Sequence, residues 1–442
     1  MKSIPVSPWL AGLCFAFALA SSASGAANAA SPDPAAFYVA NWNVENLYDV
    51  VDDPDNDGDD EFLPHNPVTR WTRERYETKL DNLAQVISGM NNGQGPDVLG
   101  LEEIENEDVI RDLVDKLEGK SYGIVHADSP DPRGIDTAMI FNRDRFSLLE
   151  THAYKVRLKW QNTTRDILHA ILEDHNGLRL HVFVNHWPSR GGGVKESEAN
   201  RFEAARVLAL ALDRIFLREP QARVVIVGDF NDEPDSRSIR KVLDVESYPV
   251  PSGAYASTNL YNLAEPKSEK GQGSFSHSFA GETEWRMYDQ IIVSGALLQG
   301  TRIEPDRDSF LIDKPAYMVE EHGRDKGAPV PTFENQEFYQ GGYSDHFPVG
   351  ARFVYLASPA SAPEAAPAKP TPAVSAPTQP PPAAGPPPPI TPTMAATVQT
   401  ILPSVAPKKE PPARPAPAPA KKPAAPAVAP PRAESPADVV VW

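Results

Sequence analysis

The sequence has 442 residues and a net charge of −18 at pH 7. A chain this acidic lacks the broad positive face with which a protein coats DNA or RNA, so that class of function is excluded. If the protein acts on nucleic acid, it needs a metal cation and local Arg or Lys side chains at the site.

The first 30 residues have the pattern of a secretory signal peptide. Lys2 is followed by an apolar run at residues 8–20, and Ala27-Asn28-Ala29 supplies a small-x-small cleavage site. An uncleaved N-terminal anchor is the alternative. The only cysteine, Cys14, lies in this segment. The exported chain would therefore have no thiol, and Asp, Glu, Asn and His would have to supply any metal ligands.

The last part of the chain, residues 356–442, holds more than half of the 47 prolines and almost no large apolar side chains. Such a composition cannot bury a core, so we predict a disordered or extended Pro/Ala-rich tail. The expected organisation is a signal peptide at 1–30, one folded domain at 31–355 and the tail at 356–442.

Strand-like and helix-like stretches alternate within this body. Strands are predicted at 37–44, 97–101, 136–142, 165–173, 178–186, 223–227, 289–293 and 347–354. Helices are predicted at 70–90 and 195–218, because apolar residues recur there at helical spacing. In the second helix the expected buried face carries Phe202, Ala205, Ala209, Leu212 and Phe216. This mixture predicts an α/β protein with more than one sheet.

Polar motifs follow the predicted strands, where loops on a rigid scaffold form catalytic clefts. Each motif is weak alone, and their joint order carries the signal. They are Asn43-Val44-Glu45-Asn46, Glu102-Glu103, Asn185-His186-Trp187-Pro188-Ser189-Arg190, Gly228-Asp229-Phe230-Asn231-Asp232, and Asp289 with Ser344-Asp345-His346.

These motifs resemble the endonuclease/exonuclease/phosphatase superfamily, which includes deoxyribonuclease I and exonuclease III. The resemblance covers residues 36–355. Within it, the segments 43–47, 185–190 and 228–234 are similar to a bacterial exported branch of the superfamily. It implies a four-layer sandwich in which helices flank two β-sheets. It also implies hydrolysis of phosphoester bonds.

Metal-assisted phosphoester hydrolysis needs an aligned water and neutralisation of the phosphate charge. A hard Mg²⁺ or Mn²⁺ ion prefers oxygen ligands, so Glu103 and Asn43 are predicted to bind it. The resemblance agrees and adds Asp345 as a third ligand. Glu102 precedes Glu103 where many relatives carry Gln, and the register of the motif favours Glu103.

The predicted catalytic residues are His186, Asp229, Asn231, Asp289 and His346. Asp229 would orient or deprotonate the attacking water. Asn231, two residues on, would donate to a phosphate oxygen if the segment is extended. The resemblance implies that Asp289 fixes His346 and that His186 contacts the phosphate or the leaving group. Which group is the base and which the acid stays open.

Arg190, just before the glycines at 191–193, is a predicted substrate contact. The alternative is an ordinary surface loop. Between Ser294 and Ser344 lies a segment of about 50 residues, which we expect to be a loop insertion near the mouth of the cleft.

Asp53, Asp55 and Asp57 have the spacing of a calcium-binding loop, followed by Gly58. Pro64 stands where such a loop carries its bidentate Glu. A structural Ca²⁺ and a solvated acidic turn are therefore both considered.

The leading hypothesis is an exported, metal-dependent, nonspecific nuclease acting on DNA, RNA or both. It would be a periplasmic or extracellular monomer without a stable protein partner. A phosphodiesterase or phosphatase for lipids or inositol phosphates is the second hypothesis, since one fold and metal site can serve several substrates. A non-catalytic binding module on a Pro-rich stalk is the third.

Overall fold

The structure is a computed structural model that describes residues 35–356, except 55, 160–161, 280–281, 324 and 335–337; it also leaves out the side chains of 277–279 and 282. All described residues fall in one compact unit, Met1–Ala368. The predicted signal peptide at 1–30 lies outside the described residues, as does the predicted tail beyond residue 356.

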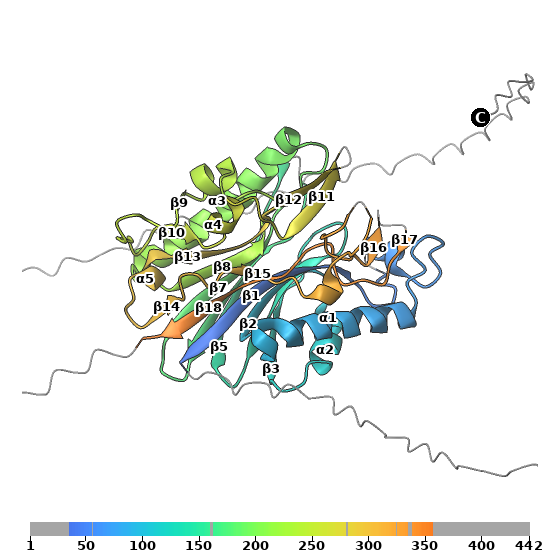
Figure 1. Ribbon diagram of the computed structural model, residues 1–442, viewed down its shortest axis with the longest axis horizontal. Helices are drawn as coiled ribbons and strands as arrows, with labels where there is room; N and C mark the ends of the chain where they lie inside the picture. Colours follow the sequence, from blue (N-terminus) through green and yellow to red (C-terminus); the bar gives the residue numbers. More distant parts are fainter. Residues whose placement is uncertain are drawn as a thin grey trace, which may run out of the picture. The chain divides into compact units, whose positions relative to one another are not determined.

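Two mixed seven-stranded sheets form the framework (Figure 1). The first has the order β14-β18-β1-β2-β4-β3, with β15 paired to β18. Its strands are β1 (Ala36–Leu47), β2 (Val98–Ile104), β3 (Tyr122–His126), β4 (Asp136–Asn142), β14 (Ile303–Pro305), β15 (Leu311–Ile312) and β18 (Val349–Tyr355).

The second sheet has the order β5-β6-β7-β8-β13-β10-β9. Its strands are β5 (Phe146–Tyr154), β6 (Ile167–Asp174), β7 (Arg179–His186), β8 (Val224–Asp229), β9 (Val245–Glu246), β10 (Leu260–Asn262) and β13 (Asp289–Ser294). Two small hairpins complete the described strands: β11 (Phe275–Phe279) with β12 (Glu282–Arg286), and β16 (Phe333–Glu334) with β17 (Phe338–Tyr339).

Three longer helices cover the sheets. They are α1 (Arg73–Gly93), α2 (Glu107–Asp115) and α3 (Val194–Arg218); α4 (Glu265–Ser268) and α5 (Gly295–Leu298) are single turns. Side-chain caps start the first two, since Thr72 accepts from the Arg75 amide and Asn106 from the Asp108 and Val109 amides. None of the helices in the described residues combines the length and apolar composition needed to cross a membrane.

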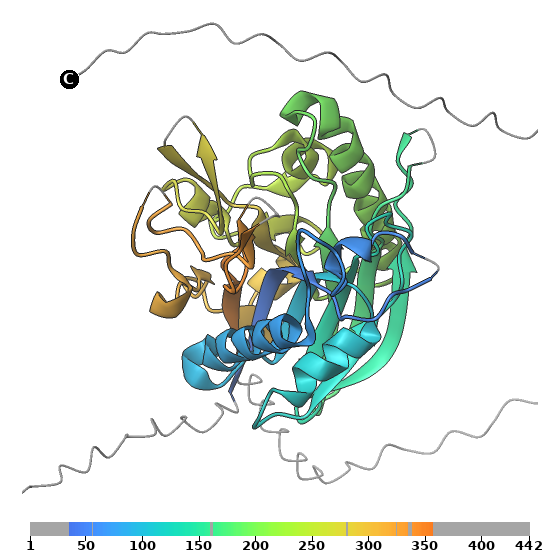
Figure 2. The same cartoon turned by 90° about the vertical axis from the view of Figure 1, so that its right-hand side faces the viewer.

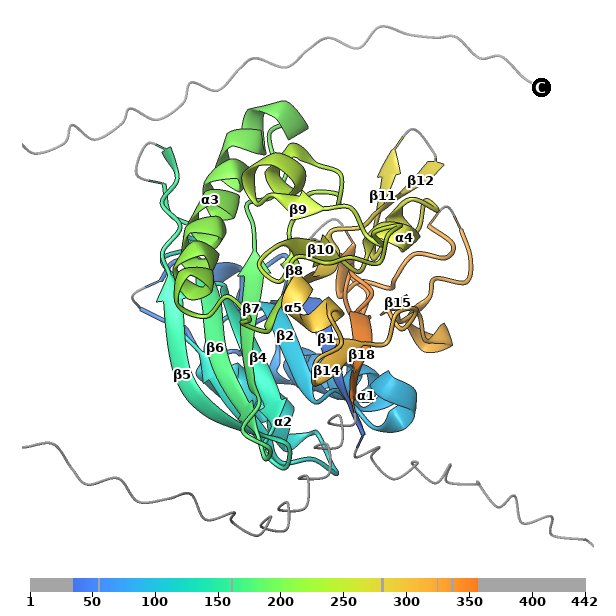
Figure 3. The same cartoon turned by 90° about the vertical axis from the view of Figure 1, so that its left-hand side faces the viewer.

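The layers follow from the alternation of side chains along the strands. In β1, Phe37 and Val39 belong to a core between the two sheets, whereas Tyr38 and Ala40 pack beneath α1 and α2. A third core lies between α3 and the outer face of the second sheet. Figures 2 and 3 show α1 and α2 on one side of the sheets and α3 on the other. The four-layer sandwich is thereby confirmed.

The predicted strands and long helices are confirmed with small shifts at their ends. The predicted buried face of α3 is partly wrong. Ala205 and Leu212 are buried, but the rest of the face consists of Ser197, Arg201, Ala204, Leu208 and Ala211, while Phe202, Ala209 and Phe216 stay half-buried. Arg201 is fully buried because its guanidinium pairs with Asp232, so this face includes a charged residue that an apolar pattern cannot reveal.

The outer face of the second sheet buries a histidine pair. His169 Nε2 lies 3.1 Å from His181 Nδ1, and the His169 ring stacks on Phe183 at 4.1 Å. Burial, reinforced by the neighbouring His181 and His152, lowers the pKa of His169 to about 3. Its imidazole is therefore neutral in the folded protein at neutral pH.

This pair predicts a loss of stability in mild acid. Because the unfolded chain binds a proton at His169 near pH 6.5 and the folded chain only near pH 3, stability is full above pH 6.5 and falls as the pH decreases. Between pH 7 and 4.5 we expect His169 to cost on the order of 2 kcal/mol. Denaturant unfolding of His169→Leu should show a correspondingly smaller acid loss than the unsubstituted protein. Equal losses in both proteins would contradict the prediction.

Candidate active site

In the second sheet, the inward face of each central strand turns from apolar to polar at one end. Along β8, Val225 and Val227 lie in the core between the sheets, and Asp229 follows with the same orientation. His186 at the end of β7 and Asp289 at the start of β13 are the register partners of Asp229 on either side. Three predicted catalytic residues are thus brought into one row.

The first sheet presents a facing row. Asn41 and Asn43 continue the inward face of β1 after Val39, and Glu102 continues that of β2. The two sheets approach closely here, because a Cβ on Gly100 would lie only 2.7 Å from Asn41 Oδ1 and from Val227 Cγ2.

Simple alternation would turn Glu103 away from this row. The register between β2 and β4 shifts between Glu102 and Ile104, and Glu103 has a φ of 65°. Such a bulge redirects a side chain at the end of a strand. In the described part of the chain, eight non-glycine residues have a positive φ, and half of them cluster at this site: Glu45, Asn46, Glu103 and Asn231. Such a concentration of backbone strain is typical of functional sites.

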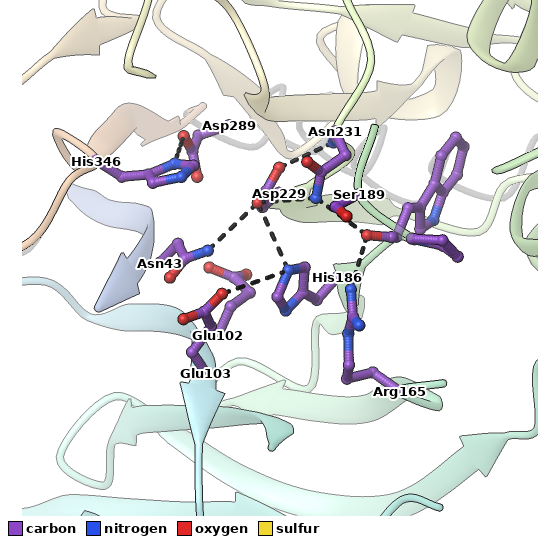
Figure 4. A network of polar contacts seen from close by, with 12 residues as sticks. Asn43, Glu102, Glu103, Arg165, His186, Ser189, Asp229, Asn231, Asp289 and His346 are labelled. Atoms are coloured by element: carbon purple, nitrogen blue, oxygen red, sulfur yellow. Dashed lines mark hydrogen bonds and ion pairs between the residues drawn. The ribbon is translucent and has the colours of Figure 1, made fainter. Parts of the chain in front are cut away.

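Asp229 is the hub of the polar network (Figure 4). Its Oδ2 accepts from Asn43 Nδ2 at 3.3 Å and lies 3.6 Å from His186 Nε2. Asn231 donates to both oxygens of this carboxylate, from its backbone N to Oδ1 at 2.8 Å and from Nδ2 to Oδ2 at 3.1 Å. Burial raises the pKa of Asp229, while the nearby His346 opposes the shift and Asp289 adds to it. The carboxylate is therefore poised to accept a proton.

Asp289 and His346 form a tight buried pair. His346 Nδ1 lies 2.7 Å from Asp289 Oδ2, which also accepts from Ser274 Oγ at 2.6 Å. Burial alone would lower the pKa of His346, but the carboxylates of Asp289 and Asp345 raise it well above its usual value. This imidazole is thus held as a cation, with Nδ1 occupied by Asp289.

His186 has the opposite character. Burial lowers its pKa well below the usual range, and the guanidinium groups of Arg165 and Arg133 lower it further. Its Nε2 lies 3.9 Å from Glu103 Oε1, and its Nδ1 is buried with no hydrogen-bond partner in the part of the chain that the structure describes. The site therefore combines one neutral and one cationic histidine, an arrangement suited to proton transfer.

The two adjacent glutamates also differ in charge. Burial would raise the pKa of Glu103, but the positive charges of Arg133, His346 and Arg165 lower it overall. The pKa of Glu102 is raised well above its usual value by burial and by Asp289 and Asp229. Glu103 is therefore the anion of the two, as its predicted role as a metal ligand requires.

The donor set fits a hard divalent cation. Asn43, Glu103 and Asp345 offer only oxygen atoms as ligands, the chemistry that Mg²⁺ and Mn²⁺ prefer. Glu103 and Asp345 line a cavity of about 670 Å³ together with Arg133, Phe275 and part of the segment between Ser294 and Ser344. A cation held there would stabilise negative charge on phosphate oxygens. The expected insertion does lie at the cleft.

Two predicted substrate contacts are engaged within the protein. Asn231 has a φ of 50°, so the segment after Asp229 is a turn and the extended geometry expected for it is wrong. Asn231 Nδ2 donates to both Trp187 O and Asp229 Oδ2, so this amide orients Asp229. Arg190 donates to Asn231 O and Asp232 Oδ1 and lies over the Tyr288 ring.

Three further polar groups hold the network in place, and none of them was predicted to belong to the site. Asn41 Nδ2 donates to Glu102 and lies 3.5 Å from Asp289, joining the two sheets. Ser274 anchors Asp289, and Ser344 Oγ donates to Asn43 O at 2.6 Å. Ser344 lies in the Ser344-Asp345-His346 motif, and Asn41 had a signal as an amide on the inward face of a largely apolar strand.

Buried polar contacts also fix the segment that carries Asp345. Lys79 Nζ donates to Thr332 Oγ1 at 2.5 Å and to Tyr343 O at 2.7 Å. The Glu45 carboxylate accepts from the Thr332 and Phe333 amides. Asp345 follows two residues after Tyr343, so these contacts limit where its carboxylate can lie.

Replacing Lys79 by Met should lower the free energy of unfolding by about 3 kcal/mol, because two acceptors and Glu45 lose a buried cation. It should also raise the Mg²⁺ concentration needed for half-maximal activity, because Asp345 is less firmly placed. Denaturant unfolding and Mg²⁺ titrations would measure both effects. Lys116→Met is the control: it removes a surface pair to Glu77 and Asp81 and should cost less than about 1 kcal/mol.

Solved structures with this fold are similar to the chain at low sequence identity. The human nocturnin catalytic domain is 19% identical, covering 73% of this chain and 95% of that one, with a TM-score of 0.44. A truncated Caenorhabditis elegans TDP2 is 17% identical, covering 72% and 98%, at 0.44. The mannosyl-6-phosphatase Bt3783 of Bacteroides thetaiotaomicron is 17% identical, covering 72% and 99%, at 0.44. No curated protein matches the sequence.

The fold and the site together define a phosphoester hydrolase. The family model described as Endonuclease/Exonuclease/phosphatase family matches residues 38–357, and the chain belongs to this family.

Proposed function

We propose that the protein is a nonspecific nuclease that hydrolyses phosphodiester bonds of DNA, RNA or both, with Mg²⁺ or Mn²⁺ at Glu103. The observation that carries the proposal is the meeting of two rows of polar side chains across the two sheets, beside Glu103, which together with Asp345 lines the cavity. This arrangement supports in-line attack by water on a phosphoester.

The residues divide the chemistry among themselves. Asp229 accepts the proton of the attacking water, with Asn231 and Asn43 fixing its carboxylate. His346, charged and held by Asp289, donates to a phosphate or leaving oxygen from Nε2. The neutral His186 contacts the other phosphate oxygens. Arg133 lies on the wall of the cavity, 3.3 Å from Glu103, and offers positive charge to a backbone.

A small phosphoester, such as an inositol phosphate, is the second candidate. Glu320, Asp325 and Glu334 line the same cavity, and their carboxylates oppose a polyanion more than a small substrate. None of the predicted catalytic positions is lost, which argues against the binding-module hypothesis.

A substrate panel separates these functions. Purified full-length protein would be assayed on plasmid DNA, RNA, bis-p-nitrophenyl phosphate, inositol phosphates and sphingomyelin, with and without EDTA. Mg²⁺-dependent cleavage of plasmid DNA or RNA supports the nuclease. Turnover confined to the small phosphoesters or to the lipid would overturn it in favour of the second candidate or the lipid hypothesis, and no turnover at all would support a binding module.

We also propose that the protein is exported and acts as a monomer. The proposal of export depends on the composition of residues 1–30. N-terminal sequencing of protein recovered outside the cytoplasm should begin near residue 30, and size-exclusion chromatography with light scattering should give the mass of one chain. Retention in the cytoplasm with an intact N-terminus would contradict export.

A further inference from the structure

Three acidic side chains converge in the loop between β1 and α1. Asp52, Asp59 and Asp60 each place one carboxylate oxygen within 4.8 Å of the others. Oxygens this close can share one Ca²⁺ ion, whose Ca–O distances are about 2.4 Å. Across the part of the chain that the structure describes, no Lys, Arg or His forms an ion pair with any of the three.

The central member of this cluster has an unsatisfied oxygen. Asp59 is only 2% exposed, and its Oδ2 accepts from the Asp53 amide at 2.8 Å. Its Oδ1 is buried and has no hydrogen-bond partner among the described residues. A buried carboxylate oxygen without a partner is costly unless a cation or a donor reaches it.

The surrounding charge is also unbalanced. Burial raises the pKa of Asp59, and Asp52 and Asp53 raise it further. A divalent cation between these carboxylates would relieve their mutual repulsion.

We propose that Asp52, Asp59 and Asp60 bind a structural Ca²⁺ ion, at a site separate from the catalytic metal. These are not the residues that the loop spacing predicts. Asp53 contributes its backbone amide to Asp59, Asp57 is exposed and lies outside the cluster, and Asp55 lies outside the described residues.

The loop is packed against a segment that reaches the active site. A Cβ on Gly58 would lie 2.6 Å from the backbone of Pro132 and Arg133, and Tyr48 Oη donates to Arg133 O at 2.5 Å. The Arg133 guanidinium in turn contacts Asn46 and Glu103. An ion that orders the loop would therefore also help to position the Arg133 guanidinium, which lies beside Glu103, the predicted ligand of the catalytic metal.

Thermal unfolding of the full chain, stripped with EDTA and titrated with CaCl₂, tests the proposal without any assay of activity. Saturating Ca²⁺ should raise Tm by at least about 4 °C. Asp57→Asn is the matched control in the same loop and should keep the whole shift. Asp59→Asn should lose it, yet in EDTA it should be at least as stable as the unsubstituted chain, because it removes a buried charge.

Glu103→Gln separates this site from the catalytic metal and from the proposed function. It should keep the Ca²⁺-induced shift and should need at least tenfold more Mg²⁺ than Ca²⁺ to reach it. The proposal is overturned if Ca²⁺ does not raise Tm, if Asp59→Asn keeps the shift, if Glu103→Gln loses it, or if Mg²⁺ and Ca²⁺ act at equal concentrations.

Discussion

Replacing Glu103 by Gln should lower kcat on any phosphoester substrate by about 1,000-fold, because the metal loses its anionic ligand. The change is nearly isosteric, so the fold should be retained. Steady-state kinetics at several Mg²⁺ concentrations would measure the effect. A defect in metal binding is reduced by higher Mg²⁺, whereas a misfolded protein is not rescued.

Glu102→Gln is the matched control for this prediction. Glu102 is fully buried and its pKa is raised well above the usual value, so an amide closely imitates its neutral form. We expect its kcat to stay within about threefold of the unsubstituted enzyme. If Glu102→Gln were the inactive variant and Glu103→Gln the active one, the assignment of the metal ligand would be reversed.

Replacing Asp229 by Asn should also reduce kcat by about 1,000-fold, through loss of the group that accepts the proton of the attacking water. KM should change little, because this carboxylate, 2% exposed beside Asn43, acts on the attacking water and not on the substrate. Rapid-quench or steady-state kinetics would separate kcat from KM.

Asp232→Asn, in the same motif, is the control that separates a loss of catalysis from a loss of stability. The Asp232 carboxylate pairs with Arg190 and with the buried Arg201, and it does not accept from the groups that donate to Asp229. Asp232→Asn should therefore lower Tm and keep most of kcat. A large loss of kcat in Asp232→Asn with an unchanged Tm would show that the motif acts as a unit and that Asp229 has no separate role.

The sequence predicts the members of the site better than their geometry. Asp229, His186 and Asp289 could be anticipated because each extends the apolar face of a recognisable strand. Glu103 was predicted from ligand chemistry and from the register of its motif. Alternation along the strand instead points Glu102 inward, and a bulge turns Glu103 toward the site. Backbone irregularities of this kind depend on pairing with β4, a tertiary contact that no local pattern encodes.

The same dependence on tertiary contacts explains why the ion pairs of Arg190 and Arg201 could not be predicted. An arginine before glycines suggests a phosphate contact, but its partner Asp232 belongs to a motif 42 residues away in the chain. The burial of Arg201 could not be predicted, because a charged residue interrupts the apolar spacing of the helix. Its partner Asp232 reaches it only in the folded protein. Buried ion pairs are properties of the assembled fold.

Asn41 has a wider consequence for how this protein responds to ligands. Because it links Glu102 of one sheet to Asp289 of the other, the chemistry is assembled across the plane where the two halves of the sandwich meet. An inhibitor that contacts both sheets should therefore stabilise the whole domain against unfolding. Inhibitor potency should therefore rise in parallel with melting temperature, so that a simple thermal screen can rank compounds before the physiological substrate is known.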